Sequence, residues 1–359
     1  MGYIEQNPCT GYSERYVKNG NGMRVTRHEE IEKVFCGKPH VVILGAGASY
    51  ASLPNGDKNG RKLPLMNNLI STLSLQDLIK PIESLNSSFN FEEIYSRLSS
   101  DPKAIEIVKE LENSIYSYFK ELSLPEQATI YDYLVLSLRE KDVIATFNWD
   151  PFLVQAITRN GRRFKMPKVL FLHGNVGVGY CENGHSMGHV GSACANCGGK
   201  LYAIPLLYPI ENKNYHLNDF ISRQWSVLSE ALEKAPLVTI FGYGAPSSDV
   251  SAVDLLKGAW GNPNLRTIEQ IEIIDVKKEE ELKETWSFLI HSHHYSVRDD
   301  FFNSWISKHP RRTCEAFLNQ YIEAKFIEDN NIERFTDLSK VWLWFDELQL
   351  YETFRENDN

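Results

Sequence analysis

The sequence has no excess of basic charge and no long apolar run. Its 359 residues carry a formal net charge of -9, and no dense run of Lys and Arg supplies the basic face that phosphate neutralisation needs. We therefore do not expect nucleic acid as a direct ligand. Neither a cationic, apolar leader nor a stretch long enough to cross a bilayer is present, so we expect a cytoplasmic protein that does not contact the membrane.

Cysteine is also scarce. Six cysteines in a chain of this length are too few for a disulfide framework, yet three of them lie close together in the second half of the sequence. This clustering favours a metal site over disulfides. Apolar residues are not scarce: at 42% they are enough to form a sizeable core in one or two domains.

The apolar run at residues 41–44 predicts a strand buried on both faces, of the kind found inside a parallel sheet. The small residues Gly45, Ala46, Gly47 and Ser49 follow it. Such a turn, opening onto a helix, offers backbone N–H groups and the favourable end of the helix dipole to a pyrophosphate. Because the same pattern also occurs at ordinary tight turns, the loop alone leaves both interpretations open.

Two further apolar runs end in polar side chains. Residues 143–150 predict a second buried strand that leads to Asn148 and Asp150, and residues 168–172 predict a third that leads to His173. Ligands of open parallel sheets bind at the carboxyl ends of the strands, where these side chains would hold a reacting group. His173 is well placed as a general base, although a lone histidine is more often structural.

A second glycine loop comes later in the chain. The apolar run 237–241 predicts a strand that leads to Gly242 and Gly244, a loop suited to phosphate or ribose, and then a helix capped by Asp249. The next predicted strand ends at Asp275. A carboxylate at this position can bind an adenosine ribose, and a solvent-facing aspartate is the competing interpretation.

The cysteine cluster has the spacing of a zinc ribbon. Cys194 and Cys197 form a Cys-x-x-Cys pair followed by two glycines, a zinc-knuckle pattern, and Cys181 with His185 forms a looser first half. His189 competes for the fourth position, and unliganded thiols are the alternative to a metal. Without an open coordination position or a metalloprotease-type glutamate, the predicted zinc is structural.

The stretch between the first two strands has helical periodicity. Residues 65–140 predict a helical insertion divided into several helices by Pro, Asn and Ser. Its Glu92, Glu93 and Arg97 fit a solvated helix face better than a site. Residues 53–64 predict a charged, mobile loop, which is either a lid or a plain surface loop.

These segments together predict an α/β fold: a Rossmann-like parallel sheet with a helical insertion, a small zinc-ribbon module and a C-terminal helical layer. We expect an N-terminal arm at residues 1–38 and a nucleotide-binding domain at 39–300, which contains the insertion at 65–140 and the zinc module at 177–203. Residues 301–359 are helical and aromatic-rich, and could also form an oligomer interface.

The motifs, in their order along the chain, resemble the sirtuin family over roughly residues 40 to 280 with the insertion subtracted. The resemblance implies that NAD+ is bound, with Zn2+ as a structural ion. It implies a pyrophosphate site at Gly45, Ala46, Gly47 and Ser49, and contacts to phosphate and ribose from Gly242, Gly244 and Ser247. It further implies that Asn148 orders ribose and water, Asp150 holds the nicotinamide carboxamide, His173 is the base and Asp275 binds the adenosine ribose.

Two departures from sirtuin deacylases bear on the reaction. The Ile-Pro-Asp-Phe-Arg-like segment is replaced by Leu53-Pro54 or by Leu63-Pro64 without Phe-Arg, and residues 207–211 replace the Phe-Gly-Glu strand that pairs with the substrate peptide. These departures, the Phe-Asn-Trp-Asp form of the second motif and the large insertion are similar to the sirtuin-like domains of bacterial anti-phage defence proteins.

This resemblance implies an NAD+ glycohydrolase that releases nicotinamide and ADP-ribose and depletes NAD+ in anti-phage defence. It also implies a homo-oligomer, or an assembly with an ATPase or nuclease partner. An NAD-dependent protein-lysine deacylase and a non-catalytic sensor of NAD or ADP-ribose derivatives are the alternatives.

Overall fold

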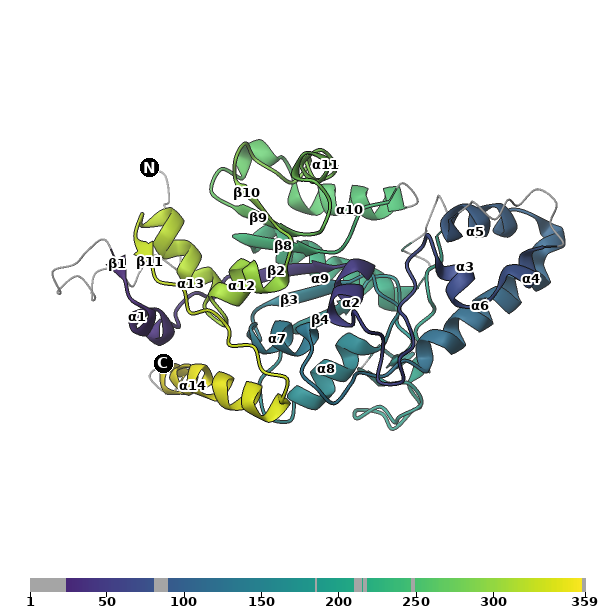
Figure 1. Cartoon of the computed structure of the whole chain (residues 1–359), viewed down its shortest axis with the longest axis horizontal. Helices are drawn as coiled ribbons and strands as arrows, with labels where there is room; N and C mark the ends of the chain where they lie inside the picture. The colour runs from purple at the N-terminus through teal and green to yellow at the C-terminus, as the bar shows by residue number, and fades with distance from the viewer. Residues whose placement is uncertain are drawn as a thin grey trace.

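The computed structural model describes residues 24–80, 90–184, 186–209, 215, 218–246 and 249–356. Its centre is a six-stranded sheet in the order β10-β9-β8-β2-β3-β4, in which every neighbouring pair is parallel (Figure 1). The strands are β2 (His40–Leu44), β3 (Val143–Thr146), β4 (Lys168–Phe171), β8 (Leu237–Phe241), β9 (Gln270–Ile274) and β10 (Tyr295–Arg298). The predicted parallel sheet is confirmed.

The strand order creates one crevice. The chain runs outward from β2 to β3 and β4, crosses back to pair β8 with β2, and then continues outward to β9 and β10. The winding therefore reverses between β2 and β8. In doubly wound sheets the ligand crevice lies at this reversal, outside the carboxyl ends of the strands.

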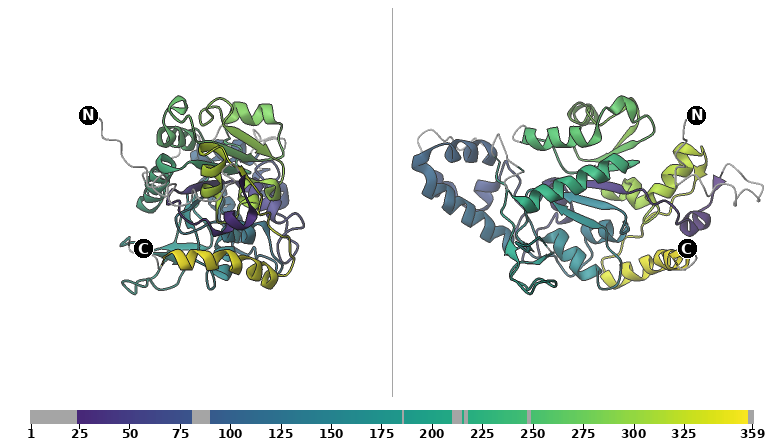
Figure 2. Two further views of the ribbon diagram at one scale, coloured as in Figure 1. Left: turned by 90° about the vertical axis from the view of Figure 1, so that its left-hand side faces the viewer. Right: turned by 180° about the vertical axis from the view of Figure 1, so that it is seen from behind.

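Helices cover both faces of the sheet. On one face α2 (Ala46–Ser52) and α8 (Phe152–Asn160) both pack against α7 (Ile130–Leu136), and on the other α9 (Asp219–Lys234) packs against α10 (Val250–Trp260) and the sheet (Figure 2). A short α11 (Glu279–Thr285) connects β9 to β10. All residues of β2 and β8 are buried as a result, which explains why their sequences are apolar except at His40 and Thr239.

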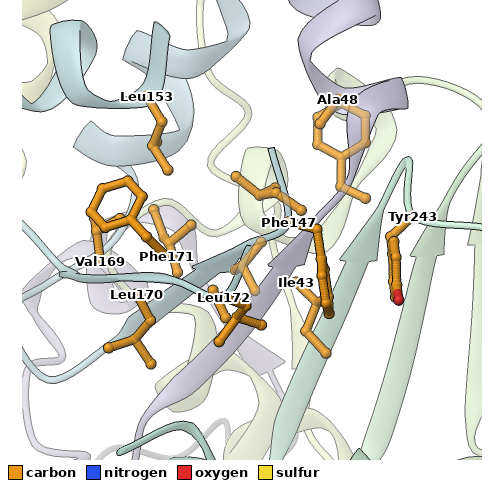
Figure 3. Close-up of a cluster of buried hydrophobic side chains, with 14 of the residues drawn as sticks. Ile43, Ala48, Phe147, Leu153, Val169, Leu170, Phe171, Leu172 and Tyr243 are labelled. Atoms are coloured by element: carbon orange, nitrogen blue, oxygen red, sulfur yellow. The ribbon is translucent and has the colours of Figure 1, made fainter. Parts of the chain in front are cut away.

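An aromatic pair lies beside the carboxyl ends of β3 and β8. The rings of Phe147 and Tyr243 stack with their centroids 4.0 Å apart and their planes 9° from parallel, as Figure 3 shows. Ile43 of β2 and Ala48 of α2 belong to the same buried cluster. The stack holds the two chain segments that follow these strands at a defined separation.

The helical insertion extends away from the sheet (Figure 1). Its helices are α3 (Leu69–Thr72), α4 (Gln76–Ile79), α5 (Phe91–Ser99) and α6 (Ile105–Lys120), with a 3-10 turn at Pro102–Ala104 before α6. Helix α6 buries Leu111, Ile115 and Phe119, which share one face because they are four residues apart. The predicted 65–140 insertion also included α7. In the structure this helix packs against α2 and α8 beside the sheet, and its residues 131–136 are all buried there.

The loop at residues 53–64 is anchored. The buried carboxylate of Asp57 accepts hydrogen bonds from the backbone N–H groups of Asn59 and Arg61, both at 2.8 Å, and from Ser123 N–H at 3.1 Å. These bonds tie the loop to the chain that follows α6. Pro54, Asn55 and residues 58–60 remain exposed, so the segment is a surface loop whose turn Asp57 organises.

The three clustered cysteines lie in the loops between the strands of a small antiparallel sheet, whose order is β6-β5-β7. Its strands are β5 (Val178–Tyr180), β6 (Met187–His189) and β7 (Tyr202–Ala203). This module follows β4 in the chain, where the zinc ribbon was predicted.

The described part of the N-terminal arm packs on the C-terminal layer. Strand β1 (Arg24–Val25) precedes α1 (Arg27–Glu32) and pairs in parallel with β11 (Phe326–Ile327). The C-terminal helices are α12 (Trp305–Lys308), α13 (Thr313–Phe317) and α14 (Leu338–Glu356). Among the residues that the structure describes, no helix combines the length and the hydropathy of a membrane span.

Candidate active site

The loops at the carboxyl ends of the strands enclose a cavity of about 700 Å³. Each predicted nucleotide-contacting or catalytic residue in the described part of the chain lines it: Gly45, Ala46, Gly47, Ser49, Asn148, Asp150, His173, Gly242, Gly244 and Asp275. Ser247 lies outside the described residues. Residues more than two hundred positions apart in the sequence thus surround one space.

The two glycine loops touch each other through their backbones. A Cβ on Gly45 would lie 2.5 Å from the carbonyl oxygen of Gly242, and one on Gly242, whose φ is +61°, would lie 2.3 Å from the backbone nitrogen of Ala48. The Gly47 N–H donates to the Gly242 carbonyl at 2.9 Å. Contact between the loops therefore requires glycine at positions 45 and 242, in addition to any requirement from a ligand.

A buried hydrogen-bond network fixes Asn148. Its Nδ2 donates to the carbonyl of Gly45 at 2.8 Å and to Ser49 Oγ at 2.9 Å, while Ser49 Oγ donates to Asp150 Oδ2 at 2.6 Å. Because the Ser49 proton is used in this way, the Tyr131 hydroxyl, 2.6 Å away, donates to Ser49. Tyr131 comes from α7 and belongs to no motif, so sequence analysis did not identify it.

The side-chain carboxyl group of Asp150 has a raised pKa. Its side chain is buried, and this burial raises its pKa to about 6, although the hydrogen bond from Ser49 acts in the opposite direction. Asn175 Nδ2 donates to the Asp150 carbonyl at 2.7 Å and orients the backbone here. The side chain therefore changes its protonation state near pH 6.

His173 lines the cavity and is surrounded by aromatic rings. Its Nε2 is 2.7 Å from the Tyr215 hydroxyl, and its ring meets Phe147 edge-on at 4.7 Å. The same Nε2 lies 3.8 Å from Asp249 Oδ1. Tyr243 donates its hydroxyl proton to Asp249 Oδ2 at 3.0 Å.

Asp249 does not have the role that the sequence predicted. It occupies the N-cap position of α10, but its side chain makes no capping hydrogen bond and lines the cavity instead. Aspartate at this position usually indicates a cap, worth about 1 kcal/mol. Neither Asp249 nor Tyr215 could be assigned to the site from sequence, because their contacts with His173 form only in the folded chain.

Two acidic residues lie on other parts of the cavity wall. Asp275 is partly exposed, and its Oδ1 accepts a hydrogen bond from the Lys277 N–H at 3.0 Å. Glu92, at the start of α5, also lines the cavity, although its sequence context favoured a solvated helix face. The insertion therefore contributes a carboxylate to this wall.

The helical insertion also covers the chain segment at residues 207–209. Tyr208 stacks on Tyr95 of α5 with ring centroids 5.0 Å apart, packs against Trp149, and donates its hydroxyl proton to the carbonyl of Glu112 at 3.1 Å. The Leu207 N–H donates to the His173 carbonyl at 2.9 Å. One side of this segment is therefore occupied by the protein's own helices.

The three clustered cysteines converge. The sulfur atoms of Cys181, Cys194 and Cys197 all lie within 4.8 Å of one another, and two of them, on Cys181 and Cys197, are 3.6 Å apart. Tight turns with glycines at positive φ, Gly184 at +72° and Gly198 at +71°, bring the thiols together. Three converging thiolates are ligands that suit tetrahedral zinc.

Of the two histidines predicted as candidates for the fourth zinc ligand, His189 lies apart from the cysteines. This residue is exposed on β6, its Nε2 lies 3.4 Å from Thr158 Oγ1, and it is not part of the cysteine group. The alternative, His185, lies outside the described residues. Ser186 Oγ, 3.1 Å from Cys194 Sγ, helps to lower the pKa of that thiol to about 6, which favours the metal-binding thiolate.

Comparisons with known proteins find similarity only among solved structures. No protein-family model and no curated protein matches the sequence. The structure is similar to a Sir2 homologue in complex with NAD, at 16% identity and a TM-score of 0.38, covering 82% of this chain and 93% of that one. A Sir2 homologue variant in complex with ADP-ribose gives 15% identity and a TM-score of 0.39, with 80% and 95% covered.

Proposed function

We propose that this chain is an NAD+ glycohydrolase, which cleaves NAD+ to nicotinamide and ADP-ribose. The supporting observation is the cavity at the winding reversal, where both glycine loops, Asn148, Asp150 and His173 meet. Dinucleotides bind across this position in doubly wound sheets. The cavity volume of about 700 Å³ is within the usual range for cofactor-sized ligands.

The side chains suit cleavage of the nicotinamide–ribose bond. This reaction passes through an oxocarbenium-like state, which needs nearby dipoles or negative charge and a base for the incoming water. We assign the ordering of ribose and water to Asn148, which Ser49 and Gly45 hold in place. Asp150 would hold the carboxamide, and His173 would take the proton of the attacking water.

The covered segment at 207–209 favours water over acyl-lysine as the acceptor. In the deacylases that the sequence resembles, the corresponding strand pairs with the substrate peptide. Here the side chain of Tyr208 already stacks on Tyr95 and donates a hydrogen bond to the carbonyl of Glu112. A peptide would have to displace these contacts, whereas water needs no docking strand.

We further propose the cellular setting that the motif resemblance implies. The enzyme would deplete NAD+ during anti-phage defence, as a homo-oligomer or beside an ATPase or nuclease partner. Cys181, Cys194, Cys197 and His185 would hold a structural zinc ion that stabilises the small sheet. Asp275 would contact the adenosine ribose, and Ser247 would contribute to the second glycine loop.

The direct test is to incubate the purified full chain with NAD+, with and without an acetyl-lysine peptide, and to measure nicotinamide by chromatography. We expect release that does not depend on peptide. His173→Ala and Asn148→Ala should each reduce turnover about 100- to 10,000-fold. His28→Ala, at a side chain that is 74% exposed, is the matched control and should keep full activity.

Each other outcome selects a different function. Strict dependence on peptide would identify a deacylase. NAD+ binding by calorimetry without turnover would favour the sensor. Full turnover by His173→Ala or Asn148→Ala would refute the residue assignment, whichever reaction occurs.

A further inference from the structure

Asp249 is a buried carboxylate whose position the proposed reaction does not yet explain. It is only 4% exposed, lines the cavity and makes no side-chain hydrogen bond to the helix it precedes. A buried carboxylate needs hydrogen bonds or a nearby positive charge to remain ionised. Tyr243 supplies one hydrogen bond, and His173, whose Nε2 lies 3.8 Å from Asp249 Oδ1, is a neighbouring group that can become positive.

We propose that Asp249 is a positioning residue that supplies the counter-charge for His173 when this imidazole takes up a proton. The inference rests on the proposed function, in which His173 is the base. In this role Asp249 acts through His173 and takes no part in the bond changes.

The geometry around the carboxylate supports this role. The Tyr243 hydroxyl holds Oδ2 at 3.0 Å, while Oδ1 lies 3.8 Å from Nε2 of His173. Tyr243 cannot easily turn away, because its ring stacks on Phe147 at 4.0 Å. The orientation of Asp249 is therefore set by two elements, the loop after β8 and the start of α10.

The charge matters at one step of the reaction. As the C–N bond to nicotinamide breaks, its electron pair leaves with nicotinamide, and a water oxygen forms the new C–O bond to the ribose carbon. An O–H bond of that water breaks, and its proton forms an N–H bond on His173. An opposite charge within about 4–6 Å stabilises the resulting imidazolium.

Other groups that face His173 come from several elements. Tyr215, before α9, places its hydroxyl 2.7 Å from Nε2, and Phe147, after β3, contributes an uncharged ring edge. Glu92 of α5 acts electrostatically on Tyr243, which carries the Asp249 hydrogen bond. Within the described residues, Asp249 is the carboxylate that lies within ion-pair distance of this nitrogen.

The test compares Asp249→Asn with wild type in two measurements. An NMR titration of labelled histidines, with His173 assigned by its loss in His173→Gln, should show the pKa of His173 falling by about one to two pH units. In the NAD+ assay, kcat should fall about 10- to 100-fold with a smaller change in KM, and the acidic limb of kcat should move to lower pH.

Two further variants serve as support and control. Tyr243→Phe keeps the aromatic stack and the charge but removes the hydroxyl that orients Asp249, so we expect a smaller change in the same direction. Asp254→Asn removes a carboxylate from the same helix at a side chain that is 66% exposed, and should leave the His173 titration unchanged.

The NMR result decides the proposal independently of catalysis. An unchanged His173 pKa in Asp249→Asn overturns the counter-charge role. Absence of nicotinamide release by wild type would overturn the proposed function instead, while the titration would still report on Asp249. If Asp249→Asn does not fold, as judged by circular dichroism, the Tyr243→Phe titration decides: an unchanged pKa overturns the proposal.

Discussion

Replacing Glu272 with glutamine should make the protein more stable above neutral pH. This residue lies on β9 in the parallel sheet and is fully enclosed. Its carboxylate accepts hydrogen bonds from the Trp305 N–H at 2.8 Å and from Thr239 Oγ1 at 3.3 Å, and Arg298 Nε lies 3.8 Å away. Burial outweighs these contacts and raises the pKa of Glu272 from about 4.5 to about 7.

The sign and size of the effect follow from proton binding. Between pH 4.5 and 7 the folded chain holds a proton on Glu272 that the unfolded chain has lost, so stability falls as pH rises through this window. The difference between the two pKa values corresponds to about 3 kcal/mol. Glutamine is neutral and keeps an acceptor for Trp305, so Glu272→Gln should be about 2–3 kcal/mol more stable near pH 8 and nearly equal to wild type near pH 4.5.

Urea unfolding of wild type and variant between about pH 5 and pH 8, followed by tryptophan fluorescence, measures this difference. Glu281→Gln is the matched control, since its side chain is 54% exposed in an ion pair with Lys277 and should change stability by less than about 1 kcal/mol at every pH. A Glu272→Gln protein that is less stable near pH 8, or a difference independent of pH, would refute the reasoning.

Three further predictions concern the cavity and the cysteine module. Burial raises the pKa of Asp150 to about 6, so the KM for NAD+ should rise as pH falls below this value, and Asp150→Asn should lack that pH dependence in steady-state assays. Cys181→Ser should lose bound zinc in elemental analysis and show a lower Tm, whereas Cys36→Ser should keep the metal. Gly242→Ala places a Cβ 2.3 Å from a backbone nitrogen at a φ of +61°, so we expect about 2–4 kcal/mol of destabilisation in urea unfolding and loss of NAD+ binding by calorimetry. Gly244→Ala, whose Cβ meets nothing within 4 Å, should retain stability.

The strands were predictable because burial on both faces leaves a strong sequence signal. The runs ending before Gly45, Asn148, His173 and Gly242 are apolar at nearly every position, and each forms a strand of the parallel sheet. Since parallel strands place their carboxyl ends at one edge, the residues that follow them were expected to share a site. In the structure these residues line one cavity.

Some site residues that sequence analysis did not identify lie on helices or at helix starts, and not directly after the strands of the sheet. Tyr131 belongs to a helix whose apolar pattern fitted the insertion, and Asp249 matched an ordinary helix cap. Glu92 matched a solvated helix face. A local pattern describes a residue's own element, whereas the direction in which its side chain points depends on how that element packs.

The parallel sheet, the glycine loops after its strands and the cysteine spacing could be predicted, because each is a local pattern that dictates backbone conformation. Which partners hold the reactive groups depends on how the elements pack. Ser49, Tyr131 and Asp150 form one buried network, and His173 faces Asp249 and Tyr215, since these contacts join segments that are distant in sequence and adjacent only after folding.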